Sequence, residues 1–394
     1  MIYADNAATT ALAPEAFEAM KPYLLTEYGN ASQPYSFSRS ARAALAKARQ
    51  DIAECINAEP SEIYFTSGGT ESDNWAIKCL SSGRMALLTS MTEHKAVLRS
   101  CAAMERRGYP AAYLPVDRSG ILLPETLERF ISDSALLVSV MTANNETGTI
   151  QPVAELCRIA HAHGALFHTD AVQALGHIPV DVKSLGVDML SGSAHKFGGP
   201  KGAGFLYVRS GTPLTPYADG GAQERGLRAG TENVAGIAGM GKALEMATAN
   251  LEERMAHEQQ LRDYVINRIL KNIPEARLNG GLEHRLPGNV NISFPGLEGE
   301  TILLDLDMHN ICASTGSACN SDSLDPSHVL LSIGVPEEIG HGSMRFTFGP
   351  QNTMEEAEYL CDVLEEVIPR RRAMSCMWLQ GQNKARQFSL KGEQ

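Results

Sequence analysis

The chain has 394 residues, which is long enough for two domains or for one large α/β core with a smaller partner. Its formal net charge of −12 argues against a general nucleic-acid binder, because that role needs a basic surface. The sequence contains no uncharged apolar run near the ~20 residues of a membrane helix, and its first residues lack the basic and apolar regions of a secretory signal. We therefore expect a cytoplasmic protein that binds neither nucleic acid nor membrane.

Short apolar runs alternate with helical patterns over the first half of the chain. Strands are expected at 63–66, 85–89, 135–141, 165–169 and 205–208. Helices are expected at 41–56, 71–79, 95–107 and 153–163. This alternation predicts a mainly parallel sheet with helices on both faces. In such folds, ligand groups gather at the carboxyl ends of the strands.

Several chemically capable residues occupy the predicted strand ends: Gly69, Thr70, His94, Asn145, Asp170 and Lys196. Lys196 lies between a short polar run and a glycine-rich turn, where a partly desolvated amine can lose its proton and react with an aldehyde. Asp170 ends an apolar run, as a carboxylate at a strand end would. Together they supply the amine and the acid that pyridoxal 5′-phosphate (PLP) needs for its aldehyde and its pyridinium nitrogen. Their shared place at one sheet edge is a stronger signal than either residue alone.

A second, smaller domain is expected after a long charged helix at 235–273. The segments 289–294 and 343–348 alternate like half-buried antiparallel strands. Residues 1–14 are expected to pack on this small domain. The chain then divides into a large domain at 1–264, a small α+β domain at 265–370 and a basic tail at 371–394. The tail lacks apolar periodicity, so we expect a frayed helix or disorder there.

The eight cysteines are scattered, without a C-x-x-C pair or a cluster with histidine. Neither a disulfide framework nor a metal site is therefore expected, and most of these side chains should be buried small hydrophobes. Cys319 differs, because it lies in a small, polar segment (313–324) with almost nothing to bury it. A cysteine in such a flexible loop makes sense if its sulfur must reach a reaction partner.

Several ordered motifs together resemble the cysteine desulfurases of the nitrogen-fixation and iron–sulfur-cluster type, which belong to the class V aminotransferases. The matching segments are 3–10, 65–74, 93–97, 144–152, 168–173, 194–202, 223–233 and 287–293, followed by the Cys319 segment. The spacing from Ser314 to Cys319 is similar to that of the long-loop (group I) members. The resemblance runs from about residue 3 to about residue 365. It implies a fold-type I PLP-dependent transferase, with a large, mainly parallel sheet domain and a smaller α+β domain.

The resemblance implies PLP as the cofactor and a role for each site residue. Lys196 binds the cofactor's aldehyde, and Asp170 keeps the pyridine nitrogen protonated. The phosphate contacts are Gly69, Thr70, Ser193, His195 and, from the neighbouring subunit, Thr231. The ring contacts are His94, which stacks on the ring and shuttles protons, and Asn145 and Gln173, which face the phenolic oxygen. Arg345, with Asn145, corresponds to the residues that bind the substrate. The contact between subunits implies an obligate homodimer.

The implied reaction converts L-cysteine to L-alanine. Lys196 removes the α-proton, and a thiolate on Cys319 attacks the substrate sulfur. This leaves a persulfide on Cys319, which passes its sulfur to an acceptor protein. An iron–sulfur scaffold is the default acceptor, while a tRNA-thiolation enzyme and a specialised pathway enzyme stay open. No resident metal is implied, although Cys319 can ligate an iron–sulfur cluster transiently during transfer.

Some residues depart from the family pattern, and two other functions stay open. Tyr35 and Ser38 stand where the family usually has a histidine and a glycine, and Gly198 where a histidine or tyrosine is common. A selenocysteine lyase, or another class V aminotransferase or epimerase, would use the same scaffold, but an aminotransferase has no need for Cys319. A non-catalytic scaffold protein is disfavoured because Lys196 and Cys319 are both present.

Overall fold

The computed structural model describes residues 1–81, 83–316, 326–376 and 378. Its larger sheet has the strand order β2-β8-β7-β6-β5-β3-β4. The strands are β2 (Ile63–Thr66), β3 (Ala86–Ser90), β4 (Ala111–Leu114), β5 (Ala135–Ser139), β6 (Leu166–Asp170), β7 (Met189–Ser193) and β8 (Gly204–Val208). Strands β3 to β7 pair in parallel, whereas β8 is antiparallel to both neighbours. The predicted α/β fold with a mainly parallel sheet is confirmed.

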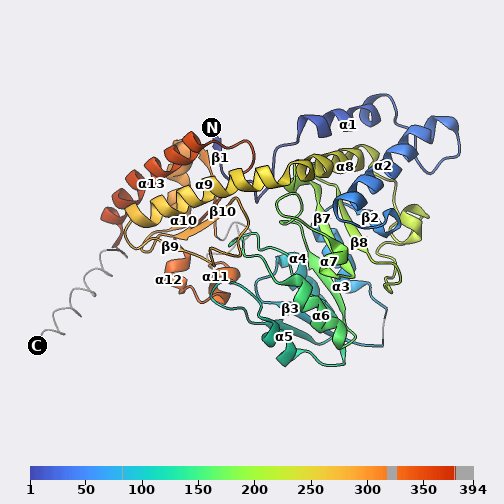
Figure 1. The fold of residues 1–394 in the computed structure, drawn as a ribbon, viewed down its shortest axis with the longest axis horizontal. Helices are drawn as coiled ribbons and strands as arrows, with labels where there is room; N and C mark the ends of the chain where they lie inside the picture. The colour runs from blue at the N-terminus through green and yellow to red at the C-terminus, as the bar shows by residue number, and fades with distance from the viewer. Residues whose placement is uncertain (82, 317–325, 377, 379–394) are drawn as a thin grey trace, which may run out of the picture.

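Helices cover this sheet, as Figure 1 shows. They are α1 (Pro14–Leu25), α2 (Arg39–Cys55), α3 (Gly69–Lys78), α4 (Lys95–Glu105), α5 (Pro124–Phe130), α6 (Val153–Ala162), α7 (Val182–Leu185) and α8 (Val234–Ala249). Helix α6 was predictable from its apolar pattern, because its buried residues Val153, Leu156, Cys157 and Ala160 recur at helical spacing. Strand β5 is buried along its whole length, and its residues are apolar up to the final Ser139.

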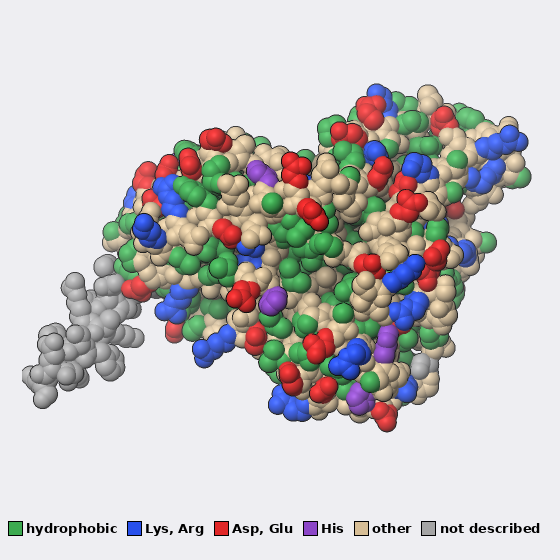
Figure 2. All heavy atoms as spheres, in the orientation of Figure 1, with side chains coloured by type: hydrophobic (Ala, Val, Ile, Leu, Met, Phe, Trp, Pro, Cys, Tyr) green, Lys and Arg blue, Asp and Glu red, His purple; other side chains and the backbone are tan. Residues whose placement is uncertain are grey.

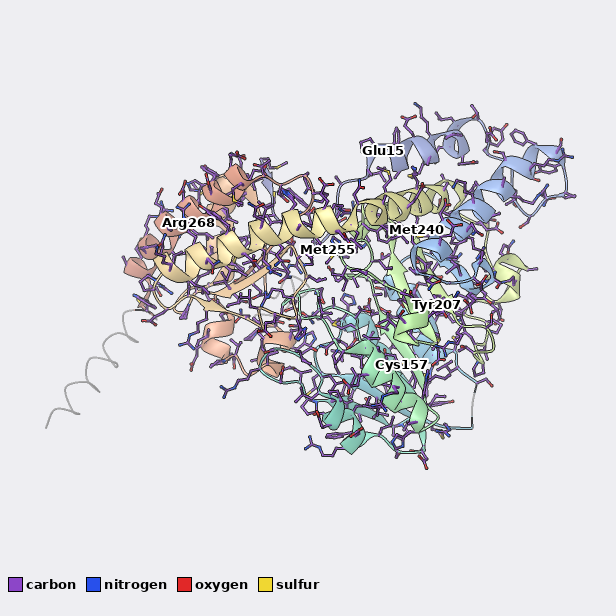
Figure 3. The ribbon with its side chains drawn as sticks, viewed as in Figure 1. Glu15, Cys157, Tyr207, Met240, Met255 and Arg268 are labelled. Atoms are coloured by element: carbon purple, nitrogen blue, oxygen red, sulfur yellow. The ribbon has the colours of Figure 1, made fainter. Side chains whose placement is uncertain are left out.

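The predicted long helix at 235–273 is two helices, α8 and α9 (Leu251–Asn272). Asn250 separates them with φ −123° and ψ 39°, outside the helical region. The two parts pack on different partners, because α8 lies against α1 and α2 whereas α9 lies against α13 (Met354–Met374). Figure 3 shows Met240 on α8 and Met255 on α9, and the two helices run end to end across the molecule.

The second half of the chain forms a smaller antiparallel sheet with the order β12-β13-β10-β9. Its strands are β9 (Arg277–Leu278), β10 (Asn289–Ser293), β12 (Ser314–Thr315) and β13 (Ser343–Thr347). Helices α9, α10 (Gly299–Met308), α11 (His328–Ser332), α12 (Glu337–Gly340) and α13 accompany it. The short strand β1 (Ile2–Tyr3) pairs in parallel with β11 (Ile311–Cys312), so the N-terminus lies on this part of the molecule.

Helix α13 extends into the segment assigned to the basic tail. It continues to Met374, and Arg371 near its end forms an ion pair with Asp305 of α10 at 2.7 Å. Arg372 is buried and stacks on the Trp378 ring, with 4.0 Å from the guanidinium carbon to the ring centre. The rest of the predicted tail, 379–394, lies outside the described residues.

The surface shown in Figure 2 carries acidic and basic side chains interspersed with one another. None of the helices in the described part of the chain combines the length and the apolar composition needed to cross a bilayer.

Candidate active site

A cavity of about 490 Å³ lies at the carboxyl ends of the central strands. The small sheet and the N-terminal segment complete its wall. The cavity is lined by most of the predicted site residues, namely Gly69, Thr70, His94, Asn145, Asp170, Gln173, Ser193, His195, Lys196 and Arg345. Asp5, Asp73 and Ser314 also line it, although the sequence analysis did not single them out.

Asp170 is the last residue of β6 and is 6% exposed. Its Oδ1 accepts a hydrogen bond from the Val172 amide at 2.9 Å. Burial raises the pKa of the Asp170 carboxyl, and the neighbouring His94 and Lys196 oppose that rise. A buried carboxylate of this kind is stabilised by a cation against it, such as a protonated pyridine nitrogen.

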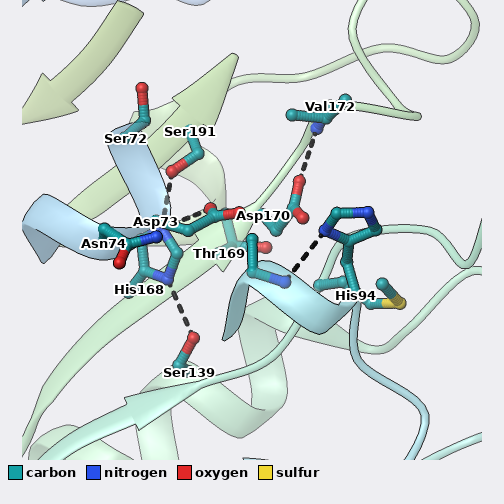
Figure 4. Close-up of polar contacts among 12 residues, drawn as sticks. Ser72, Asp73, Asn74, His94, Ser139, His168, Thr169, Asp170, Val172 and Ser191 are labelled. Atoms are coloured by element: carbon teal, nitrogen blue, oxygen red, sulfur yellow. Dashed lines mark hydrogen bonds and ion pairs between the residues drawn. The ribbon is translucent and has the colours of Figure 1, made fainter. Parts of the chain in front are cut away.

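Asp73, on α3, adds a second buried carboxyl to this end of the cavity (Figure 4). It is 1% exposed, and its Oδ1 has no hydrogen-bond partner among the described residues. Burial, followed by the charge of Asp170, raises the pKa of Asp73 well above its usual range. The two carboxyl groups thus oppose each other's ionisation, because the charge of Asp170 adds to the effect of burial at Asp73.

The ring of His168, on β6, lies beneath these carboxyl groups (Figure 4). Its two nitrogens lie 2.8 Å from the Ser139 hydroxyl and 2.9 Å from the Ser191 hydroxyl. Burial lowers the pKa of His168 to about 3, so the ring is neutral. It offers no positive charge to the acids, and the ligand atoms of Asp73, His94 and Asp170 lie within 4.8 Å of one another. The acidic floor of the cavity therefore suits a cationic ring nitrogen, as PLP has.

Lys196 ends a short turn that follows β7. The short polar run that precedes Lys196 in the sequence forms this buried strand. The Lys196 Nζ donates hydrogen bonds to the carbonyl oxygens of Ala7 (2.6 Å) and Ala8 (2.8 Å). Residues near the N-terminus therefore hold the lysine at the cavity wall. Gln173 donates to the same Ala7 oxygen at 3.0 Å.

The part of the cavity at the start of α3 suits an anion. Helix α3 begins here at Gly69, and the first-turn amides of a helix have no intrahelical acceptors. A Cβ on Gly69 would lie 2.6 Å from Val172 Cγ2, so a larger residue would crowd this corner. The Thr70 hydroxyl is exposed, Ser193 is buried, and His195 Nδ1 contacts the Thr9 hydroxyl at 3.1 Å. Burial, followed by the charge of Lys196, lowers the pKa of His195 to about 4.

His94 caps helix α4, because its Nδ1 accepts a hydrogen bond from the Ala96 amide at 3.1 Å (Figure 4). The neutral ring therefore carries its proton on Nε2. Burial lowers the pKa of His94, while Asp170 opposes that effect. A neutral imidazole at the cavity wall can stack on a flat ring and exchange a proton.

Arg345 comes from β13 in the small sheet and is 5% exposed. Its Nη1 donates to the Asn145 carbonyl oxygen at 2.8 Å, and its Nη2 lies 2.9 Å from Asp5 Oδ1. Its Nε has no partner within the described ranges. The cavity thus contains a buried guanidinium with a spare donor, which suits a substrate carboxylate.

Two predicted residues are not among those that the structure places in this cluster. Thr231 is exposed and is not among the residues that line the cavity. Cys319 lies outside the described residues. The chain on either side of it is described, and Ser314 lines the cavity.

Comparison with known proteins gives a consistent family relationship. The model of the family "Aminotransferase class-V" matches residues 2–360. The chain is 51% identical to a cysteine desulfurase IscS of Dictyoglomus turgidum, over 95% of this chain and 96% of that protein. It is 49% identical to a cysteine desulfurase IscS of Clostridium botulinum, over 96% of each. A solved structure described as a NifS-like protein superposes with a TM-score of 0.88 at 38% identity, covering 93% of this chain and 99% of that one.

Proposed function

The chain belongs to the class V aminotransferase family as a PLP-dependent cysteine desulfurase, and we propose that it stores the sulfur of L-cysteine on Cys319 and delivers it for iron–sulfur cluster assembly. The exchange balances, because L-cysteine and the Cys319 thiol give L-alanine and a Cys319 persulfide. Bound PLP supplies an electron sink for the substrate carbon that loses its proton.

The observation that carries this proposal is the convergence of Lys196, Asp170 and Arg345 on one cavity. Asp170 is the acid that keeps the ring nitrogen protonated. Lys196 would bind the cofactor and move the substrate's α-proton, and His94 would hold the ring and assist proton exchange. Arg345 would orient the substrate carboxylate together with Asn145. Gln173 and Asn145 would hold the phenolic oxygen.

The phosphate site is assigned to the start of α3. Gly69, Thr70, Ser193 and His195 surround it in this chain. We assign Thr231 to the phosphate site of a second copy, in a C2 homodimer. Its segment is held firmly, because Arg49 pairs with Glu224 at 2.7 Å and Arg228 pairs with Glu71 at 2.8 Å. Glu71 lies in the first turn of α3, so this segment runs beside the phosphate end.

The small domain brings Cys319 to the cavity in this proposal. Ser314 of β12 pairs with Arg345 of β13, so the chain enters the Cys319 segment from the cavity wall. After the segment, the Ser327 hydroxyl donates a hydrogen bond to the buried Glu146 carboxylate. The described residues before and after the Cys319 segment thus lie at or near the cavity, which supports attack by Cys319 on the sulfur of a substrate whose carboxylate is held by Arg345.

The assignment of large (1–264) and small (265–370) domains, and a cytoplasmic location, belong to the same proposal. Three separate apolar clusters support the division. Two gather residues of the large sheet and its helices, and the third gathers residues from 261 to 368 together with Ala4.

The substitution Cys319→Ser tests the proposed function. The purified variant should remain yellow and respond spectrally to L-cysteine, yet form no L-alanine or sulfide with a small-molecule reductant. Cys312→Ser is the matched control, because Cys312 is half-buried in β11 and should be dispensable. Desulfuration by the Cys319 variant at the wild-type rate would show that another group accepts the sulfur.

A further inference from the structure

The guanidinium of Arg345 is only half engaged by the protein. Its Nε and Nη2 form the edge that an arginine uses to bind a carboxylate with two parallel hydrogen bonds. Along this edge, Nη2 contacts Asp5 Oδ1 at 2.9 Å, and Nε has no partner in the part of the chain that the structure describes. One carboxylate of the protein thus takes half of this edge, and the other half, the Nε donor, is buried without a partner in the described part of the chain.

Asp5 is held firmly in this position. Its backbone bridges to Thr347 on the strand that carries Arg345. The Ser314 hydroxyl donates to the same Oδ1 at 2.9 Å. The side chain is 15% exposed and lines the cavity. This ion pair is therefore built into the cavity wall, unlike a surface pair whose side chains move freely.

We propose that Asp5 is a specificity residue that holds Arg345 Nη2 until the α-carboxylate of an amino-acid substrate takes its place. This inference rests on the proposed role of Arg345. Two carboxylates then share one guanidinium, and the repulsion between them weakens the binding of both L-cysteine and L-alanine. Asp5 thereby keeps Arg345 aligned in the absence of substrate and speeds the release of the product.

The test compares equilibrium binding of L-alanine and L-alaninamide, which lacks the carboxylate, to the holoenzyme by calorimetry. Asp5→Asn removes the charge and keeps an oxygen that accepts from Ser314. The dissociation constant for L-alanine should fall about 10-fold, and the constant for L-alaninamide should stay within about twofold. KM for L-cysteine should fall with the L-alanine constant. Asp133→Asn is the control, because it removes the same charge from a side chain that is 91% exposed.

A second pair of variants separates the possible failures. Asp5→Ser, which is neutral and shorter, should tighten L-alanine binding in the same way and covers the case in which Asp5→Asn fails to fold. Arg345→Gln should abolish the preference for L-alanine over L-alaninamide. If that preference survives, the assignment of Arg345 in the proposed function is wrong. If the preference is lost in Arg345→Gln, the assignment of Arg345 stands. The role of Asp5 is then refuted when its neutral variants bind L-alanine no more tightly than the wild type does.

Discussion

Replacing Glu93 with glutamine tests the protonation state of the buried carboxyl group that precedes His94 in the chain. The Glu93 carboxyl is fully buried, and it accepts hydrogen bonds from the Ser90 hydroxyl at 2.6 Å and the Met141 amide at 3.0 Å. These bonds tie the loop that carries His94 to the end of β5, which leads to Asn145. A glutamine keeps the shape of the side chain and an oxygen that accepts from both donors.

The expected effect depends on pH. Burial raises the pKa of Glu93 from 4.5 to about 8. The folded protein keeps this proton up to about pH 8, whereas the unfolded chain loses it near pH 4.5. The contribution of Glu93 to folding stability is therefore fully present below pH ~4.5 and is lost as the pH rises through about 8. Between pH 5 and pH 8 the loss corresponds to about 4 kcal/mol of unfolding free energy. Glutamine does not titrate, so Glu93→Gln should gain stability over the wild type by about this amount as the pH rises.

Urea unfolding at pH 5 and pH 8, at one fixed protein concentration, measures this difference. Glu128→Gln, on the exposed side of α5, is the control and should shift the midpoint little at either pH. An offset between the Glu93 variant and the wild type that stays the same at both pH values would refute the reasoning. It would mean that Glu93 is ionised in the folded protein throughout this range.

Three further predictions concern the cofactor, the dimer and the tail. Lys196→Ala should lose turnover, and borohydride reduction of the wild type should place the pyridoxyl group on Lys196 by peptide mapping; a label on Lys201 would contradict this. Thr231→Ala should weaken PLP retention about 10-fold, and a mixed dimer of this variant with Lys196→Ala should contain one native site. A fully active monomer in sedimentation would contradict this shared site. Removing 379–394 should leave L-alanine formation unchanged and slow persulfide transfer to an acceptor protein at low ionic strength. Equal transfer rates would show that the tail has no docking role.

The central sheet was predictable because its strands are buried on both faces. Strand β5, for example, is apolar from Ala135 to Val138. Such runs marked the strands, so residues at the strand ends could be placed together before any contact was known. Strand β7 was harder to recognise, because Ser191, Gly192 and Ser193 are small and polar although they are buried. Small residues are needed there, since a Cβ on Gly192 would lie 2.4 Å from the Phe205 ring.

Features that depend on distant contacts could not be read from local patterns. The break at Asn250 interrupts a sequence that remains helical in character on both sides, and it reflects the different packing partners of α8 and α9. Asp5 and Asp73 lay within recognised motifs, but nothing nearby in the sequence shows that one faces Arg345 and the other is buried under Asp170. Burial and charge pairing decide their roles, and both come from tertiary structure.

The division of the site between two sheets has a consequence for sulfur transfer. The large sheet carries Asp170 and leads to Lys196, to which we assign the cofactor, whereas β13 carries Arg345, to which we assign the substrate carboxylate. Strand β12 pairs with β13 at Arg345 itself and then leads into the Cys319 segment. Under the proposed function, a substrate held by its carboxylate at Arg345 lies against the same strand pair that precedes the Cys319 segment in the chain. The register of β12 on β13 would then set where that segment starts relative to the substrate.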